Sequence, residues 1–492
     1  MWSDRLSAAK KRRLIERLHA VLPAPDPHGR GAVTPLRLAG PKSPATVEQV
    51  AEELREEPGF AWLDGGPGSH RFFVRPLVTL SVRNGRAAVS GFNGQTFSAG
   101  GFDLLEAVFA AWGGPARALL VGYLGYELAA ELETLEPASP ADLEDDLKLP
   151  DLHLALYDEA LCHDGHHDGG GWRLESTDAW HTRRDGERVR DAEIRLAAAR
   201  KREVPEPETG RLATGPVTGR PNARGFLAAV EGTVSRIRRG QIYQANVCRR
   251  LEAKLPADRL WPLWQRLRAA SPADHGAYLS LTGHGRAVLS VSPELFLSVR
   301  EGIVTTQPIK GTRPRGATPR EDRALARELA ESAKDQAELA MIVDVARNDL
   351  GRVCTTGSVE VARHAGLMTL PTLHHLVSTV RGRLPATDSV SLLRAAFPPA
   401  SITGAPKIQA IVVAASEEER RRGPAMGALG WLSLGGDLEL SVAIRTAAAA
   451  GGRIVYHAGC GITADSDPEL ELEETAVKAR AFLTALGAAE SP

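Results

Sequence analysis

Residues 453–486 read RIVYHAGCGITADSDPELELEETAVKARAFLTAL. A strand-like run is followed by the small residues Gly459, Cys460 and Gly461, and then by a helical pattern over 467–486. Small residues let backbone N–H groups approach an anion closely, and the helix turns its positive N-terminal end toward the same place. The segment contains neither G-x-G-x-x-G nor a P-loop motif, so nothing here indicates a nucleotide site. Cys460 lacks the further Gly and the neighbouring His of a nucleophile turn, which argues against a catalytic thiol.

Carboxylates recur at helical spacing in two segments. Glu471, Glu474 and Lys478 are separated by three and four residues, so they share one face of the C-terminal helix. Residues 321–350 form the longest helical pattern of the chain, and Asp335 and Glu338 share a face of it. Four carboxylates on two helix faces suit Mg²⁺, which prefers hard oxygen ligands. The same spacing is also typical of a solvated helix face, so spacing alone leaves both interpretations open.

Residues 290–316, SVSPELFLSVREGIVTTQPIKGTRPRG, are typical of a hairpin of two strands. Lys310 lies in the turn-flanked string PIKGT. A lysine in a dry pocket or near other cations loses its proton more readily and then acts as a nucleophile or a base. A surface lysine at the end of a strand fits the same pattern.

Composition limits the class of protein. The chain has 492 residues, 60 Lys and Arg against 61 Asp and Glu, and 43% hydrophobic residues. This near-neutral balance argues against a nucleic-acid or polybasic membrane partner. The four cysteines form no CxxC pair, the N-terminus lacks a signal-peptide apolar core, and no apolar run reaches the length of a membrane span. We therefore expect a cytoplasmic protein without a disulfide framework.

Changes of texture along the chain suggest four parts. We expect an N-terminal extension at 1–32, a first region at 33–165, a linker at 202–222 and a catalytic region at 223–487. The linker is proposed because 202–222, REVPEPETGRLATGPVTGRPN, is rich in Pro, Gly, Thr and Glu.

Seven strings occur in a characteristic order: SPELF (292–296), PIKGTRPRG (308–316), ELAMIVDVARNDLG (338–351), HHLVSTVRG (374–382), ITGAPKIQAI (402–411), SVAIRT (441–446) and AGCGITADSDPELELEET (458–475). Together they resemble the chorismate-utilising enzymes, which include the large subunits of anthranilate synthase, component I of aminodeoxychorismate synthase, and isochorismate and salicylate synthases. VGYLGYELA (121–129) extends the resemblance to residues 33–160. It implies an α/β (α+β) fold of the anthranilate synthase component I type, in which large antiparallel sheets pack face to face with helices outside.

Two positions separate members of this family. Anthranilate synthases usually read PIAGT, whereas aminodeoxychorismate synthases typically read PIKGT, as this chain does at Lys310. The resemblance implies that Lys310 attacks C2 of chorismate, with Glu294 as general acid and then general base. Isochorismate and salicylate synthases carry a water-activating Lys where this chain has Gln244. An amide is no general base, which argues against a water-adding enzyme.

The resemblance also implies a substrate and metal site. Glu338 and Glu474 would bind Mg²⁺ directly, and Asp335 and Glu471 would hold its waters. Arg445 would clamp the enolpyruvyl carboxylate of chorismate. Further contacts are expected from Gly459, Cys460 and Gly461 (backbone amides), Thr403 and Gly404 (ring carboxylate), His375 (leaving or enolpyruvyl group) and Lys478 (neutralisation of the carboxylates).

The chain shows no GxCxG glutaminase nucleophile. The resemblance therefore implies a separate glutamine amidotransferase as the ammonia donor, and 4-amino-4-deoxychorismate as the product, for 4-aminobenzoate and folate or a related metabolite. Two alternatives remain: an anthranilate or 2-amino-2-deoxyisochorismate synthase, which aminates C2, and a non-catalytic chorismate-binding subunit. The tryptophan-feedback motifs of anthranilate synthases are not recognisable, so no tryptophan inhibition is predicted.

Overall fold

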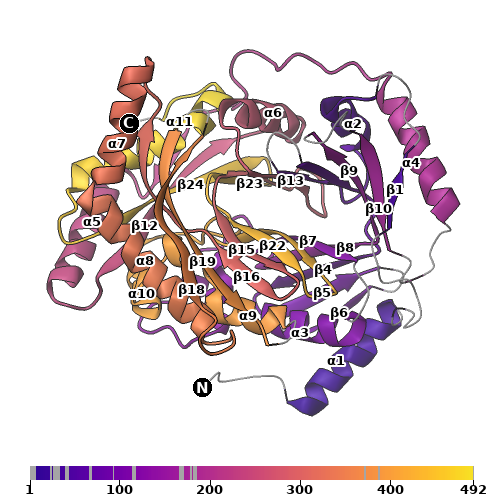
Figure 1. Cartoon of the computed structure of the whole chain (residues 1–492), viewed down its shortest axis with the longest axis horizontal. Coiled ribbons are helices and arrows are strands. Elements are labelled where there is room, and N and C mark those ends of the chain that lie inside the picture. The colour runs from indigo at the N-terminus through magenta and orange to yellow at the C-terminus, as the bar shows by residue number, and fades with distance from the viewer. Residues whose placement is uncertain are drawn as a thin grey trace.

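The structure is a computed structural model of the whole chain. It describes residues 7–22, 25, 34–38, 44–65, 69–91, 94–113, 118–165, 171–177, 180, 185–370, 373–385 and 388–490. Within these residues, two antiparallel sheets of 12 strands each form the centre of the molecule (Figure 1).

The first sheet crosses from N-terminal to C-terminal strands. Its spatial order is β1 (Thr34–Arg37), β10 (Trp172–Ser176), β9 (Glu159–Asp164), β3 (Ser69–Phe73), β2 (Ala61–Asp64), β13 (His275–Ser280), β14 (Ala287–Ser292), β23 (Thr446–Ala450), β24 (Arg453–Ile462), β12 (Gln244–Lys254) and β11 (Thr218–Arg220), with β20 (Gly404–Ala405) also paired to β12.

The second sheet also combines strands from the N-terminal and C-terminal parts of the chain. Its order is β17 (Ile309–Pro314), β19 (Leu373–Arg383), β16 (Ile303–Thr306), β15 (Leu295–Arg300), β22 (Leu438–Val442), β21 (Ala428–Ser433), β7 (Leu119–Leu124), β8 (Leu152–Tyr157), β4 (Val78–Arg83), β5 (Arg86–Ser90) and β6 (Gln95–Ser98), with β18 (Glu360–Thr369) on β19. Residues 33–165 and 223–487 therefore share both sheets.

The sheets pack face to face, and the helices lie outside them (Figure 1). The described helices are α1 (Ala8–Val21), α2 (Val47–Leu54), α3 (Gly101–Trp112), α4 (Asp185–Ala199), α5 (Ala223–Arg238), α6 (Leu260–Ala270), α7 (Pro319–Glu331), α8 (Ala333–Gly351), α9 (Ser389–Ala396), α10 (Lys407–Glu417) and α11 (Pro468–Leu486), with short 3₁₀ turns at Tyr126–Glu131, Pro140–Asp142, Ala257–Arg259 and Ala400–Ile402. The expected fold class is confirmed.

Three apolar layers hold this arrangement together. Between the sheets, side chains such as Phe73, Tyr123 and Val455 form one buried cluster. The outer face of the first sheet packs against α2, α4, α6 and α11, and that of the second packs against α1, α3, α8 and α9. The strands agree with this layering: β8 is buried on both faces, whereas β4 alternates between buried and half-buried positions.

The continuous helix expected over 321–350 is wrong. The structure has two helices, α7 and α8, which meet at Ser332. Ser332 takes an extended conformation, and its hydroxyl accepts a hydrogen bond from the Asp335 backbone N–H at 3.3 Å. This N-cap fixes the start of α8, so Asp335 lies in its first turn.

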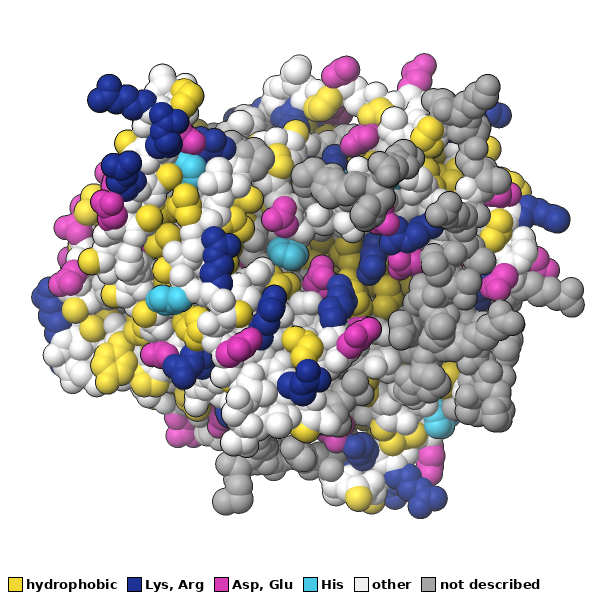
Figure 2. Space-filling view, viewed as in Figure 1, with side chains coloured by type: hydrophobic (Ala, Val, Ile, Leu, Met, Phe, Trp, Pro, Cys, Tyr) yellow, Lys and Arg dark blue, Asp and Glu magenta, His cyan; other side chains and the backbone are white. Residues whose placement is uncertain are grey.

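On the face seen in Figure 2, positive and negative side chains are interspersed around a central hollow. In the part of the chain that the structure describes, no helix combines the length and the apolar character needed to cross a membrane.

Candidate active site

The edge strand β17 carries Lys310 toward the other sheet. A β-bulge interrupts the pairing of β17 with β19 between Lys310 and Thr312. Gly311 allows it, because its φ of +70° is strained for other residues and a Cβ there would lie 3.0 Å from Asp335 Cγ. Bulges of this kind re-aim neighbouring side chains. Lys310 is half-buried, and no carboxylate of a described residue lies within ion-pair distance of it.

Lys310 meets the first sheet at Gly461 on β24. A Cβ added to Gly461 would collide with the Gln244 amide and lie 3.4 Å from Lys310 Nζ. Glycine at this position therefore leaves the room in which the lysine and the amide face each other. Gln244 is buried, and among the described residues its Oε1 has no hydrogen-bond partner. A buried unsatisfied carbonyl is costly, which marks Gln244 as a group ready for a ligand donor.

Glu294 lies between β14 and β15 and is 3% exposed. Its backbone N–H is 3.3 Å from Ser292 Oγ, and its carboxylate accepts a weak hydrogen bond from the Ile309 N–H at 3.4 Å. Burial raises the pKa of Glu294 to about 7, partly opposed by the nearby Lys310 ammonium. A carboxyl group with this pKa gives and takes a proton near neutral pH, as an acid–base catalyst must.

Four carboxylates come from α8 and α11. Asp335 and Glu338 lie in the first turns of α8, and Glu471 and Glu474 in those of α11. Burial raises the pKa of Glu338; the charges of Lys310 and Lys334 oppose this rise, and those of Asp335 and Glu474 add to it. The two helices therefore bring these charges close enough to repel one another.

Cations of the chain balance these carboxylates. Lys478 Nζ is 2.6 Å from Glu474 Oε1 and also donates to the Gly459 carbonyl at 2.7 Å. The Ser466 hydroxyl donates to Glu471 at 2.7 Å, Arg313 lies 3.4 Å from Asp335, and Lys334 lies 3.9 Å from Glu338. Burial opposes ionisation of Glu474, but the Lys478 ammonium lowers its pKa overall.

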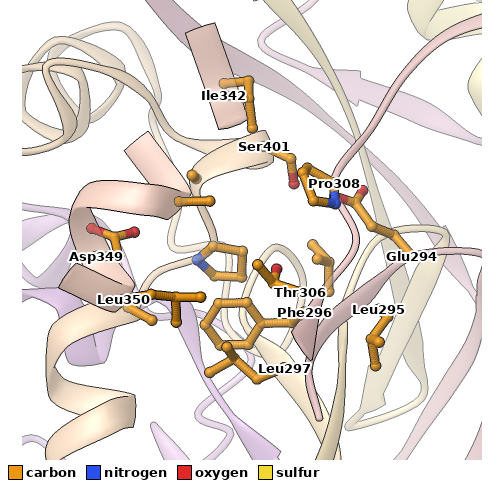
Figure 3. A pocket seen from close by; sticks show the side chains of 15 residues that line it. Glu294, Leu295, Phe296, Leu297, Thr306, Pro308, Ile342, Asp349, Leu350 and Ser401 are labelled. Carbon is orange, nitrogen blue, oxygen red and sulfur yellow. The ribbon is translucent and has the colours of Figure 1, made fainter. Parts of the chain in front are cut away.

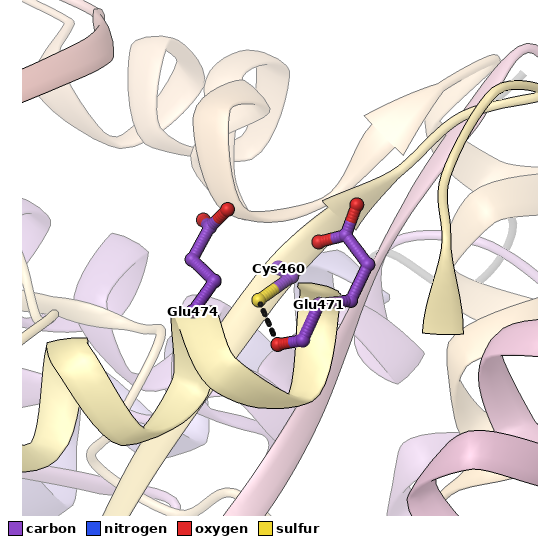
Figure 4. Close-up of side chains that lie close together, drawn as sticks. All are labelled: Cys460, Glu471 and Glu474. Carbon is purple, nitrogen blue, oxygen red and sulfur yellow. Dashed lines mark hydrogen bonds between the residues drawn. The ribbon is translucent and has the colours of Figure 1, made fainter. Parts of the chain in front are cut away.

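The donor set fits Mg²⁺ in chemistry, since it consists of carboxylate oxygens with charges that repel without a cation. Cys460 Sγ and the carboxylates of Glu471 and Glu474 lie within 4.8 Å of one another. Figure 4 shows, however, that both carboxylates extend away from the sulfur, which contacts the Glu471 carbonyl at 3.3 Å. Burial raises the pKa of Cys460, so its thiol stays protonated and is a poor metal ligand.

Strand β24 has one open edge at the site. It pairs with β12 from Arg453 to Ile462 but with β23 only from Arg453 to Tyr456. Within the described residues, Gly459, Cys460 and Gly461 therefore have a strand on one side alone. Backbone groups on such an edge are free to bind a carboxylate.

His375 on β19 faces the bulge. Its Nδ1 lies 3.2 Å from the Gly311 carbonyl and 3.0 Å from the Thr312 hydroxyl. Because a carbonyl only accepts, we assign the proton to Nδ1, which leaves Nε2 as an acceptor. Nε2 is buried and has no partner among the described residues. Burial lowers the pKa of His375 to about 4, so the ring is neutral at pH 7.

Arg445 connects β22 to β23 with a φ of +49°, a conformation that costs energy in a residue with a side chain. Its guanidinium donates to the Ser271 hydroxyl at 3.4 Å, and no carboxylate of a described residue pairs with it. The same charge contributes to the lowered pKa of His375. An arginine held in this way is available for an anionic ligand.

Thr403 and Gly404 pack beneath Gln244. The Thr403 hydroxyl donates to the Pro399 carbonyl at 2.8 Å, and its own carbonyl accepts from the Asn246 N–H at 2.8 Å. A side chain at Gly404 would collide with the backbone carbonyl of Gln244, so this glycine lets β20 approach β12.

The structure thus gathers segments that are far apart in the sequence around Lys310. Two groups at the site were not predicted. Ser466 orients Glu471, and the bulge at Gly311 aims Lys310. In the sequence, the turn string DSDP indicates the first feature and the glycine after Lys310 indicates the second.

Comparison with known proteins decides the family. Residues 58–484 match the family model described as chorismate binding enzyme. The chain belongs to the chorismate binding enzymes. The resemblance inferred from the seven strings is therefore confirmed.

Similar members of this family have two kinds of name. Aminodeoxychorismate synthase component 1 of Salmonella typhimurium is 36% identical over 370 residues, which cover 75% of this chain and 77% of the relative. Anthranilate synthase component 1 of Streptomyces coelicolor is 37% identical over 393 residues, which cover 77% and 74%. The crystal structure of anthranilate synthase component I from Streptococcus pneumoniae superposes with a TM-score of 0.71 at 27% identity, covering 84% of this chain and 92% of that one.

Proposed function

We propose that this chain is the chorismate-converting component of an aminodeoxychorismate synthase, which makes 4-amino-4-deoxychorismate from chorismate and ammonia. One observation carries the proposal: Lys310 is aimed by a bulge at the open edge of β24, next to the buried acid Glu294. Relatives named aminodeoxychorismate synthase component 1 support it.

The first step uses Lys310 and Glu294 together. The neutral Lys310 amine attacks C2 of chorismate, both ring double bonds shift by one position, and the C4 hydroxyl leaves as water with the proton of Glu294. The adduct nitrogen keeps both of its hydrogens and carries the positive charge of a secondary ammonium, so Lys310 leaves as a neutral amine when the C2–N bond breaks again. Hydroxide is a poor leaving group, so the proton is essential.

In the second step, ammonia attacks C4 and the C2–N bond to Lys310 breaks. The electron pair returns to the lysine nitrogen, and Glu294, now ionised, takes a proton from the incoming nitrogen. The sum is chorismate and ammonia giving 4-amino-4-deoxychorismate and water.

Other residues would hold the substrate. Arg445 and the open edge of β24 suit the enolpyruvyl carboxylate, while His375 Nε2 and Gln244 Oε1 accept hydrogen bonds from ring or hydroxyl donors. Glu338 and Glu474, with Asp335 and Glu471 behind them, are the residues that would hold Mg²⁺. When bound, Mg²⁺ would neutralise the ring carboxylate of chorismate and promote loss of the hydroxyl. Thr403 and Gly404 would line the same side, and Lys478 would balance the carboxylates.

The ammonia donor would be a glutamine amidotransferase, and the relatives' designation as component 1 fits a two-part enzyme. A separate lyase would then release 4-aminobenzoate for folate or for a related metabolite.

Anthranilate synthesis is the second candidate, because anthranilate synthase relatives are as similar in sequence. That reaction places nitrogen on C2, the carbon that the Lys310 adduct would occupy. Water addition at C2 is disfavoured because the Gln244 amide is no base.

A product assay tests the proposal. The purified chain is incubated with chorismate, MgCl₂ and an ammonium salt, with and without an aminodeoxychorismate lyase, and the aminobenzoates are separated by chromatography. We expect 4-aminobenzoate only with the lyase. Formation of 2-aminobenzoate would establish the anthranilate alternative, and a chain that binds chorismate without turnover, even with glutamine and an amidotransferase, would be a binding subunit.

A further inference from the structure

A narrow cavity borders Glu294, and Lys310 is not among the residues that line it. It encloses about 20 Å³, room for little more than one molecule of the size of water or ammonia. Its wall is mostly apolar, with Phe296, Ile342, Ala346 and Leu350 among the lining residues. In Figure 3, Glu294 stands at one end of the cavity and Asp349, on α8, at the other.

A surface groove of about 740 Å³ lies on the other side of Asp349. It runs along the C-terminal half of α8 and the start of α10, and Tyr243 and Ile408 are exposed on it, at 73% and 44%. Asp349 lines both the groove and the cavity. The two spaces therefore approach each other at this carboxylate.

A buried ion pair closes the boundary. Lys407 Nζ lies 2.6 Å from Asp349 Oδ2 and donates to the Ala396 carbonyl at 2.7 Å. Lys407 lines the groove, Ala396 lines the cavity, and Asp349 is only 5% exposed. A single ammonium group thus ties together the groove, the helix and the wall of the cavity.

We propose that ammonia reaches Glu294 through this boundary, from the α8–α10 groove into the narrow cavity, and that the Asp349–Lys407 pair is the gate. The inference rests on the proposed function. Size and polarity select the molecule: a cavity of this volume admits neutral ammonia but not chorismate, and ammonium would lose its hydration along the apolar wall between Glu294 and Asp349. The cavity ends at the carboxyl group that would take the proton of the incoming nitrogen. Opening requires only that the Lys407 side chain swing into the groove.

The passage is tested by filling it. Ala346→Leu adds bulk inside the cavity, and Ala340→Leu makes the same change on the same helix, facing the groove. With ammonium salts as the nitrogen source, we expect Ala346→Leu to raise the KM for ammonium about tenfold and leave the chorismate KM within about twofold. Ala340→Leu should change neither. Chorismate binding in the absence of ammonium, measured by calorimetry, reports whether the site itself is intact.

The gate is tested with the amidotransferase partner present. Lys407→Met removes the ammonium group that closes the boundary, whereas Lys407→Arg keeps a cation there. We expect Lys407→Met to lower the ratio of chorismate aminated to glutamine hydrolysed, because ammonia that has entered the cavity returns through the open boundary before it reacts, and Lys407→Arg to restore that ratio. A purely structural pair would lower thermal stability without changing the ratio.

The outcomes separate the inference from the proposed function. Equal ammonium KM values for Ala346→Leu and Ala340→Leu would overturn the passage. A loss of chorismate affinity in Ala346→Leu as large as the rise in its ammonium KM would overturn it as well. An unchanged ratio in Lys407→Met would overturn the gate. A wild-type chain that aminates no chorismate, either at any ammonium concentration or with glutamine and the amidotransferase, would refute the proposed function, and the passage with it.

Discussion

A recess between the two sheets, lined by residues that include Arg71, Arg300 and Trp431, can be compared with the candidate active site. Both contain arginine, but their arginines have different partners. In the recess, of about 110 Å³, the guanidinium groups of Arg71 and Arg300 lie over the Trp431 ring, 5.2 and 4.5 Å from its centroid. Each arginine also meets a carboxylate: Arg71 lies 3.7 Å from Glu175 and Arg300 2.7 Å from Glu439. Both arginines of the recess therefore have partners within the protein.

The candidate active site leaves several groups without such partners. Among the described residues, Arg445 and Lys310 have no carboxylate within ion-pair distance, and the buried atoms Gln244 Oε1 and His375 Nε2 have no hydrogen-bond partner. Folding alone gains nothing from this arrangement, because each unsatisfied buried group costs free energy. Single unpaired buried atoms also occur elsewhere, such as Trp62 Nε1 and Trp264 Nε1. The difference therefore teaches that a ligand is expected where several unpaired groups gather, as they do around Lys310.

Glu294→Gln is expected to have the largest effect. The amide keeps the size of the side chain but neither gives nor takes a proton, so kcat for chorismate amination should fall by about 10³-fold. Initial rates with ammonium salts measure this. Glu127→Gln is the matched control, since burial also raises the pKa of Glu127 to about 7 while backbone N–H groups of Arg422 and Gly423 bind it. A similar loss of kcat in both variants would show that replacing any buried carboxyl group lowers kcat, and that Glu294 has no special role in the reaction.

The pH dependence of stability should show the same carboxyl group. Because the folded pKa of Glu294 is about 7, the native state keeps a proton that the unfolded chain releases near pH 4.5. Stability from this group is therefore present below about pH 4.5 and is lost as the pH rises through 7. Between pH 5 and 8, Glu294→Gln should gain on the order of 2 kcal/mol in unfolding free energy relative to wild type. Urea denaturation at several pH values measures the difference; a constant difference would mean that Glu294 titrates normally.

The sequence predicted which site residues share a helix better than it predicted which distant segments come into contact. Helical spacing placed Asp335 with Glu338, and Glu471 with Glu474 and Lys478, and the structure has each set on one helix. That Lys310 would face Gly461 and Gln244 depends on the edges of two sheets coming together, which local spacing does not encode; the family resemblance supplied it.

Two features escaped prediction for physical reasons. The break at Ser332 depends on one capping hydrogen bond, which competes with a helical pattern that continues on both sides. Asp349 stands in the apolar stripe of α8 with Leu339, Ile342 and Ala346, all buried. A charge at such a position signals a buried partner, but the partner, Lys407, is distant in the sequence.

Arg445→Lys is a smaller change at the unpaired end of the site. Lysine keeps the charge but loses the planar two-point contact with a carboxylate, so the chorismate KM should rise about tenfold with kcat changed less. Rates at varied chorismate concentration measure this. Arg300→Lys makes the same substitution in the recess and should leave the chorismate KM unchanged. An effect of equal size at Arg300 would mean that the recess, too, binds substrate.

The smallest effect is expected where the charges are already paired. Glu439→Gln removes the partner of Arg300 at a half-exposed position, and exposed ion pairs of this kind contribute about 0.5 kcal/mol. Both kinetic constants should stay within about twofold of wild type, because Arg300 keeps its contact with the Trp431 ring and no group of the candidate site loses a partner. Steady-state kinetics and thermal unfolding, measured side by side, decide the matter. A tenfold loss of activity with little loss of stability would show that the recess acts on the active site through the buried cluster between the sheets. Pairing within the protein would then no longer separate structural charges from functional ones.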